Sequence, residues 1–263
     1  MDIDWRTAGA DLIHACLEDL TPEVFPLAAE NEAFSDEHVR VLLKNPGLSG
    51  ELLVRISRER RFFQKTALLA SLLLHPKFPR ARGLEIVRYL FWRDLLRVSS
   101  QPSVHPQLRI VAEHLLAERI PDLTLGEKMS IARTAGRAVL RSLREDPNPR
   151  VVQCLLRNWR CTEEDALFVA GSPQTPSDVL AVLARDSRWR SRQAVKSQLV
   201  RNRRLGLPIA LGLLPELGGA DLAAVARQAD LPKIVRDAAR RLLQGPARRV
   251  DTEGDVGAND DTL

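Results

Sequence analysis

Aromatic residues are scarce in this chain of 263 residues. They make up 5% of it, and tyrosine occurs once, whereas apolar residues as a whole reach 44%. Because β-sandwich cores are rich in aromatic and β-branched side chains, this composition favours helices. The apolar fraction is high enough for a buried core, and the length fits one large domain or two small ones.

Cysteines are also few, and their pattern is not that of a disulfide framework. The chain has three, Cys16, Cys154 and Cys161, and no two of them form a CxxC pair. An odd number without close spacing fits a reducing compartment. Cys154 is expected on the core face of a helix, whereas Cys161 falls at a turn, where it could be exposed. Neither has a recognisable histidine partner motif, so we expect neither to be a nucleophile.

Long hydrophobic runs are missing. The longest lies near residues 67–75 (ALLASLLLH), far short of the roughly 20 residues that span a bilayer. Residues 1–20 have neither the basic start nor the apolar run of a signal peptide. We therefore expect a soluble, cytoplasmic protein with no membrane span.

Motifs for metal, nucleotide or catalytic chemistry are missing too. The five histidines form neither an HExxH motif nor a paired ligand set. Residues 125–130 (LGEKMS) lack the spacing of a phosphate-binding loop. Paired acids occur where helices are expected to begin, and there they complement the helix dipole. We therefore expect no metal, no cofactor and no catalytic residue.

The charge of the chain is unevenly distributed. The net charge is +5, but residues 1–40 hold ten acids and two bases, a net −8, and residues 251–263 hold five acids and no base. Residues 41–250 therefore hold 37 bases and 19 acids, a net +18. A basic body between acidic ends suggests an anionic partner, or ends that shield the body from wrong partners. The alternative is an ordinary solvated surface.

Regular punctuation is the second feature that the chain does have. Polar residues close to prolines lie 12, 14, 14 and 16 residues apart: Asp146, Asn158, Ser172, Asp186 and Asn202. Such residues cap helices, and a nearby proline fits a first helical turn. Helices this short are marginal alone, so they must bury their apolar faces on neighbours. We predict an all-α fold of short stacked helices.

The pattern divides the chain into three regions. Residues 1–35 are predicted to form an acidic cap, with one helical pattern followed by a proline-broken loop. Residues 36–244 are predicted to be the repeat domain, which opens with Ser35 as a helix cap. Within it, residues 80–102 form one predicted helical segment. Residues 245–263 are predicted to be a disordered acidic tail.

An internal repeat appears at an offset of about 127 residues, and such self-similarity is typical of repeat architectures. When residues 51–118 are laid over residues 178–245 without a gap, about a fifth of the positions are identical, and polar pairs such as Asp94 and Asp221 are among them. A chain rich in leucine and arginine gives some matches by chance. We interpret the gapless match as an internal duplication.

Two kinds of segment resemble known helical repeats. Residues 105–116 (HPQLRIVAEHLL) and 231–243 (LPKIVRDAARRLL) resemble the P-x-[LV]-R-x-x-A pattern of HEAT-like repeats. Residues 146–158 (DPNPRVVQCLLRN), followed by 175–186 (TPSDVLAVLARD), resemble the leucine-rich repeat variant. The resemblance implies a right-handed α-solenoid over about residues 36–244. The spacing is irregular, and the cysteine-rich iron–sulfur segment of some leucine-rich repeat variant proteins is missing, so no cluster is implied.

The resemblance also implies structural roles for two pairs of matching residues. In HEAT-like repeats, aspartate and arginine side chains at such places bond to neighbouring turns and repeats. The residues concerned are Asp94, Asp221, Arg109 and Arg236.

The clearest candidate site is basic. Spacings of three and four residues place two stripes of cations on helix faces, each beside an aromatic residue. The first is Arg58, Arg61 and Lys65 beside Phe62, and the second is Arg185, Arg188, Arg192 and Lys196 beside Trp189. Arginine presents planar donors to phosphate or carboxylate, and an adjacent ring can stack. The alternative is a solvated outer face with both rings in the core.

These features favour a non-enzymatic scaffold or adaptor that binds a protein or another anionic partner, with Trp189, Phe62 or Trp92 as anchors. An alternative is a nucleic-acid-binding protein. Some HEAT-like proteins are DNA glycosylases that act on alkylated bases with a basic concave surface, aromatic residues and an acid, but no residue here matches their catalytic motif. A further alternative is a regulator or chaperone of another protein, as in other HEAT-like families.

Overall fold

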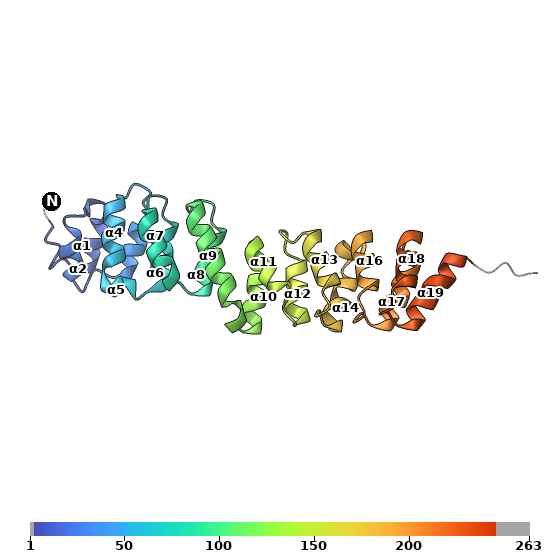
Figure 1. Cartoon of the computed structure of the whole chain (residues 1–263). Helices are drawn as coiled ribbons and strands as arrows, with labels where there is room; N and C mark the ends of the chain where they lie inside the picture. The colour runs from blue at the N-terminus through green and yellow to red at the C-terminus, as the bar shows by residue number, and fades with distance from the viewer. Residues whose placement is uncertain (1–2, 246–263) are drawn as a thin grey trace, which may run out of the picture. The chain divides into compact units, whose positions relative to one another are not determined.

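The chain is all α-helical, as the sequence predicts. The computed structural model describes residues 3–245, which form 19 α-helices, four 3-10 helices and no strand. Neighbouring helices pack on one another in sequential pairs (Figure 1). The α-helices are α1 (Ala10–Ala15), α2 (Phe25–Glu30), α3 (Asp36–Leu42), α4 (Gly50–Arg58), α5 (Arg60–Phe63), α6 (Thr66–Leu74), α7 (Arg80–Ile86), α8 (Trp92–Ser100), α9 (Pro106–Arg119), α10 (Leu125–Thr134), α11 (Arg137–Leu143), α12 (Pro149–Leu156), α13 (Glu163–Gly171), α14 (Ser177–Arg185), α15 (Ser187–Arg190), α16 (Gln193–Val200), α17 (Leu207–Leu213), α18 (Gly219–Arg227) and α19 (Lys233–Gln244). The 3-10 helices are η1 (Leu17–Asp19), η2 (Val87–Tyr89), η3 (Ile120–Asp122) and η4 (Leu214–Glu216).

Two compact units divide the chain, unit 1 over residues 1–165 and unit 2 over residues 166–263. The sequence-based division into a cap, a repeat domain and a tail stays a prediction, and the tail from residue 246 onward lies outside the described residues. No helix within residues 3–245 has both the length and the apolar character needed to cross a membrane.

A recurring turn joins the short helices. The carbonyl of a polar residue accepts a hydrogen bond from the backbone N–H three residues later, and that later residue is buried. The pairs that link one helix to the next are Asn31–Phe34, Asn45–Leu48, Glu59–Phe62, His75–Phe78, Gln101–Val104, Asn158–Cys161, Ser172–Thr175, Asn202–Leu205 and Gln228–Leu231. Three of the polar residues that punctuate the sequence, Asn158, Ser172 and Asn202, are therefore parts of these turns. Asp186 instead caps α15 with its side chain.

The turn explains the positions of two cysteines. Cys154 is buried in α12, as predicted. Cys161 is also buried, with 2% of its surface exposed, so the expectation that it could be exposed is wrong. It is the last residue of a turn that points its fourth side chain into the core.

Buried asparagines tie some of these turns to an earlier segment of the chain. The Asn31 side-chain amide donates to the carbonyls of Trp5 and Ala8 at 3.0 and 2.9 Å. Asn158 donates in the same way to Ala132 and Ala135 at 2.9 and 3.2 Å. These carbonyls lie at or just beyond the ends of turns or helices, where backbone acceptors otherwise lack partners.

His75 and Asn202 occupy the same kind of place. The Asn202 amide donates to the carbonyls of Ala170 and Ser172 at 2.7 and 3.0 Å. His75 lies with its Nε2 3.0 Å from the Asn45 carbonyl. The two side chains differ, but both connect one turn with the preceding one.

Two of the differences from the sequence-based helix boundaries have a local cause. α2 begins inside the predicted loop, because Pro26 lies in the first turn, where its missing N–H costs nothing. The segment predicted over residues 80–102 is divided into α7 and α8, since Leu90 and Phe91 adopt extended backbone conformations after η2. The Ser35 cap of α3 is confirmed, as part of a capping box with His38.

Several elements have the same bounds when shifted by the offset of the sequence match. α4 covers residues 50–58 and α14 covers residues 177–185, and the relation also holds between α5 and α15, α7 and α17, η2 and η4, and α8 and α18. The starts of α6 and α16, and of α9 and α19, obey it too. Two positions separated by this offset, such as 50 and 177, are called counterparts below.

Candidate anion-binding grooves

The first predicted stripe is largely occupied by contacts within the chain. Arg61 donates to the carbonyls of Asn31 and Phe34, and its guanidinium lies 4.7 Å from the centre of the Phe62 ring. Burial lowers the pKa of Arg61 from its ordinary value. Lys65 forms an ion pair with an aspartate of α3 at 2.6 Å. Only Arg58 of this stripe is exposed and without a side-chain bond.

The second stripe is more exposed, but its ring is not. Arg185, Arg188 and Arg192 are exposed, whereas Trp189 retains only 2% of its surface and lies 4.3 Å from the Arg188 guanidinium. Lys196 is half-buried, and its ammonium lies 3.5 Å from a carboxylate oxygen of unit 2. Phe62 is 1% exposed. Both rings are therefore core residues, as the alternative interpretation has it, and Trp189 cannot serve as an exposed anchor.

Trp92, the third predicted anchor, is half-buried at the start of α8. Its indole N–H donates to Glu127 Oε1 at 2.9 Å. Hydrogen bonds from Thr124 lower the pKa of the Glu127 carboxyl, and the bond from Trp92 adds to that effect. The polar end of Trp92 is therefore already used inside unit 1.

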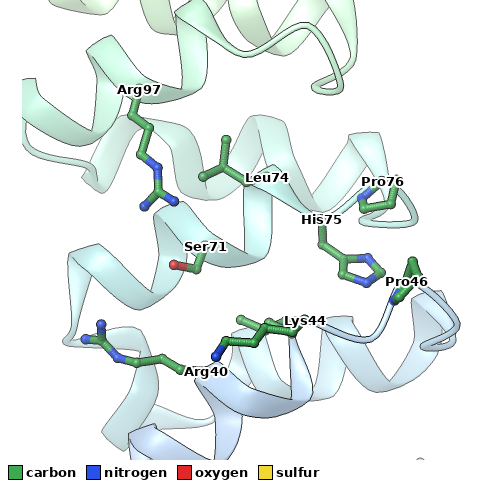
Figure 2. Close-up of a pocket in the computed structure, with 9 residues that line it drawn as sticks. Arg40, Lys44, Pro46, Ser71, Leu74, His75, Pro76 and Arg97 are labelled. Atoms are coloured by element: carbon green, nitrogen blue, oxygen red, sulfur yellow. The ribbon is translucent and has the colours of Figure 1, made fainter.

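A different set of cations surrounds a groove in unit 1, which we call groove 1. It is a half-open cavity of about 420 Å³ between α3, α6 and α8. Figure 2 shows Arg97 reaching from α8 toward Ser71, with Arg40 and Lys44 on the opposite side. Its lining consists of Arg40, Leu43, Lys44, Pro46, Ser71, Leu74, His75, Pro76 and Arg97.

The lining of groove 1 is positively charged. Arg40, Lys44 and Arg97 are exposed, and none of them forms an ion pair with any described residue. Asp36 and Asp94 are near enough for these cations to favour their charged forms, but neither lines the cavity. A cluster of cations with few neutralising partners nearby attracts anions.

Groove 2 is the corresponding cavity of unit 2, with a volume of about 460 Å³. Six of its lining positions are counterparts of groove 1 positions. Its lining consists of Gly171, Pro173, Gln198, Arg201, Asn202, Arg203, Gln228 and Asp230. Glycine and glutamine replace Lys44 and Ser71, and an acid is present, so its charge is far more balanced.

Three lining residues of groove 2 are hydrogen-bonded within unit 2. Arg201 Nε donates to Gln228 Oε1 at 3.2 Å, and the Gln228 amide donates back to the Arg201 carbonyl at 3.0 Å. The Asn202 amide is bonded to backbone carbonyls, as described above. In unit 2 the lining of this cavity is thus partly bonded to itself and includes an acid, whereas in unit 1 it includes three cations and no carboxylate among the described residues.

The aspartates of the internal sequence match are structural, as the resemblance implies. Asp221 accepts hydrogen bonds from Gln193 and Ser197 of α16 at 3.0 and 2.8 Å, and Asp94 is hydrogen-bonded to Thr66 of α6.

The arginines of that match behave differently. The Nε atoms of Arg109 and Arg236 are buried without a hydrogen-bond partner, and neither side chain bonds to a neighbouring turn within residues 3–245. The bonds that the resemblance implies for these two side chains are therefore not formed among residues 3–245.

Acidic clusters in the described part of the chain have structural roles. Asp165 is 1% exposed on its side chain, lies 3.1 Å from an Arg137 nitrogen and accepts from the Thr162 backbone at the start of α13. Among residues 3–245, no group of His, Cys, Asp and Glu side chains is arranged to hold a metal ion. The chain matches no family model, and neither a curated protein nor a solved structure matches it.

Proposed function

We propose that the chain is an α-solenoid built from a duplicated set of helical repeats. The helix bounds that recur between counterpart positions support this. So do the hydrogen bonds, because Asn158 and its two acceptors Ala132 and Ala135 are counterparts of Asn31, Trp5 and Ala8. The six shared lining positions of the two grooves are a third, independent support.

The proposed function is that of a non-enzymatic scaffold or adaptor that binds an acidic segment of a partner protein in groove 1. The observation that carries it is the set of three exposed cations around one cavity whose lining contains no carboxylate. Arg40 and Arg97 would bind carboxylates with planar donors, and Lys44 would add a point charge. Leu43 and Leu74 offer apolar contact beside them.

Groove 1 favours an acidic peptide over a nucleic acid. Its lining contains no Phe, Tyr or Trp, and its one ring, the His75 imidazole, lies 3.0 Å from the Asn45 carbonyl through Nε2, whereas single-stranded nucleic acid is held largely by stacking on rings. Groove 2, its counterpart, lacks the same density of cations, and a duplex would need many phosphate contacts. The DNA glycosylase alternative also requires an acid, and no carboxylate is among the described residues that line groove 1.

The test is a binding titration with a fluorescein-labelled peptide of repeated Glu-Glu-Leu units, followed by fluorescence anisotropy. The triple variant Arg40→Ala, Lys44→Ala, Arg97→Ala should bind about tenfold or more weakly, because each exposed charge pair contributes up to about 1 kcal/mol. Added salt should weaken the wild-type complex.

Arg150→Ala is the matched control, since Arg150 is exposed and its side chain forms no bond with any residue among 3–245. This control should keep the wild-type affinity for the peptide. A labelled DNA duplex serves as the competing ligand. If the duplex binds more tightly than the peptide, and the triple variant loses it, the partner is a nucleic acid and the peptide proposal is wrong.

A further inference from the structure

Inside unit 1, α9 packs against α11. α9 is the counterpart of α19, the last described helix, and α11 is the counterpart of α1, the first. Both Leu116 of α9 and Val139 of α11 are fully buried. The backbone N–H of Ala138 donates to Glu113 Oε1 at 2.9 Å. This junction therefore combines an apolar contact with a polar bond at the start of α11.

The counterparts of both surfaces are uncovered at the two ends of the described chain. Leu243 of α19 is the counterpart of Leu116 and is 43% exposed. Leu12 of α1 is the counterpart of Val139 and is 44% exposed. Gly9, the counterpart of a glycine in contact with Glu113, faces open space. Leu242 is also 43% exposed. Each end thus presents one half of the junction that unit 1 contains complete.

We propose that α19 of one copy of this chain binds α1 of a second copy, head to tail, as α9 binds α11 inside unit 1. Such a contact joins two different surfaces and does not close on itself in a pair, so it adds copies one after another. The proposal depends on the correspondence between counterpart positions and not on the anion-binding role of groove 1.

The charges of the two surfaces are complementary. α19 contains four bases and one acid, whereas residues 1–40 have a net charge of −8. At the place of the Glu113–Ala138 bond, the counterparts are Arg240 and Asp11, which have opposite charges. Arg240 is half-exposed and bonded only to groups of its own unit, Asp237 and a backbone carbonyl. Opposite charges across an interface favour the correct pairing and fix its register.

Sedimentation velocity over a range of concentrations tests the proposal on the full chain. A contact between two short helices is small, so the wild-type chain should associate weakly, with species larger than a dimer appearing toward about 1 mM. Leu12→Glu and Leu243→Glu, both at exposed sites, should each be monomeric at the same concentrations.

Mixing the two variants is the decisive step. Leu12→Glu keeps an intact α19, and Leu243→Glu keeps an intact α1. An equimolar mixture should therefore form dimers and nothing larger. Asp11→Arg and Arg240→Glu should each weaken association about tenfold, in line with loss of a contact at the centre of an interface, and their mixture should recover it.

Leu207→Glu is the control, because Leu207 is 41% exposed and lies on neither end surface; it should associate like the wild type. Circular dichroism checks that every variant is folded. A wild-type chain that stays monomeric at every concentration overturns the proposal. A mixture that remains monomeric, or a block by only one of the two leucine variants, overturns it as well.

Discussion

Groove 1 and groove 2 occupy counterpart positions, yet their chemistry differs. In unit 1 the cavity is lined by three cations that form no ion pair with described residues, whereas in unit 2 Arg201 is tied to Gln228 and an acid is present. The turns and the helix starts around the two cavities are the same. A shared backbone arrangement therefore carries two different surfaces, and function has to be read from the side chains that line them.

The two grooves also show how neighbouring side chains are fitted to each other. Lys44 in unit 1 faces Ser71, a small residue, and their counterparts are Gly171 and Gln198. A Cβ atom at Gly171 would lie 2.4 Å from the Gln198 side-chain nitrogen. The long amide of unit 2 thus takes the space that a side chain at position 171 would need.

The largest expected effect concerns the ring at the counterpart positions Phe62 and Trp189. Phe62→Ala and Trp189→Ala should each lower the free energy of unfolding by about 3–5 kcal/mol, because both rings are buried. Trp189→Phe, which installs the residue of unit 1, should cost at most about 2 kcal/mol. Chemical denaturation measures all three. A Trp189→Ala cost of less than about 1 kcal/mol would show that this ring is not part of the core.

The next effect is a transfer of the binding site. Gly171→Lys, Gln198→Ser and Ala224→Arg place Lys44, Ser71 and Arg97 of groove 1 at their counterparts in unit 2, where Arg201 and Arg203 already line the cavity. Isothermal titration calorimetry with the acidic peptide should then find two sites per chain. The free energy of peptide binding at groove 2 should become about 1–2 kcal/mol more favourable than in the wild type.

The control for this transfer is Gly171→Lys alone. Because Gln198 remains in the way, this variant should be less stable by about 1 kcal/mol and should gain no site. If Gly171→Lys alone binds as well as the triple variant, the fit between positions 171 and 198 is irrelevant, and the comparison of the grooves is wrong on that point.

A smaller effect separates Asp94 from its counterpart Asp221. Burial raises the pKa of the Asp94 carboxyl, with Arg97 opposing the shift. Hydrogen bonds from Gln193 and Ser197 lower the pKa of Asp221. A lowered folded-state pKa contributes stability above the unfolded-state pKa, and this is lost as pH falls through the folded value. A raised one contributes stability below the unfolded-state pKa, lost as pH rises through the folded value.

We therefore expect Asp221→Asn to reduce the free energy of unfolding near neutral pH by about 1 kcal/mol. Asp94→Asn should leave it unchanged or slightly higher. Denaturant titrations near neutral and acid pH measure the difference, which should shrink as the carboxyl groups become protonated. The opposite order near neutral pH would contradict the assignment.

The smallest effect concerns an exposed pair. Phe63 and Tyr89 form an edge-to-face contact with centres 5.2 Å apart, and their counterparts Arg190 and Glu216 form an ion pair. The hydrogen bond from Arg190 lowers the pKa of Glu216. Double-mutant cycles should give about 0.5–1.5 kcal/mol for the rings and less than about 1 kcal/mol for the ions. Only the ionic value should fall in high salt, and equal salt sensitivity would contradict the comparison.

Much of the architecture could be predicted from the sequence. The all-α class, the Ser35 cap and the burial of Cys154 follow from composition, capping chemistry and periodicity, which are local properties. The burial of Cys161 does not follow from the sequence pattern, because a turn whose last residue points inward depends on a hydrogen bond that no periodicity reveals. The break between α7 and α8 was missed for a similar reason.

The candidate site was harder to predict than the fold. Arg40 lies in α3 and Lys44 in the turn just after it, but Arg97 comes from α8, and only the packing of α3, α6 and α8 brings them to one cavity. The stripes seen in the sequence are positions where a cation and a ring stand side by side in both units. Arg61 there donates to backbone carbonyls of a turn, and Trp189 is buried in the core.

The most direct test of the central claim is to map where the acidic peptide binds. A Glu-Glu-Leu peptide that carries a photo-crosslinking group is irradiated with the full chain, and the adducts are located by mass spectrometry. Adducts should fall within residues 40–46, 71–76 and 97, and they should disappear from the Arg40→Ala, Lys44→Ala, Arg97→Ala variant. Adducts concentrated on residues 185–196, or spread over the surface and unchanged in that variant, would contradict groove 1 as the binding site.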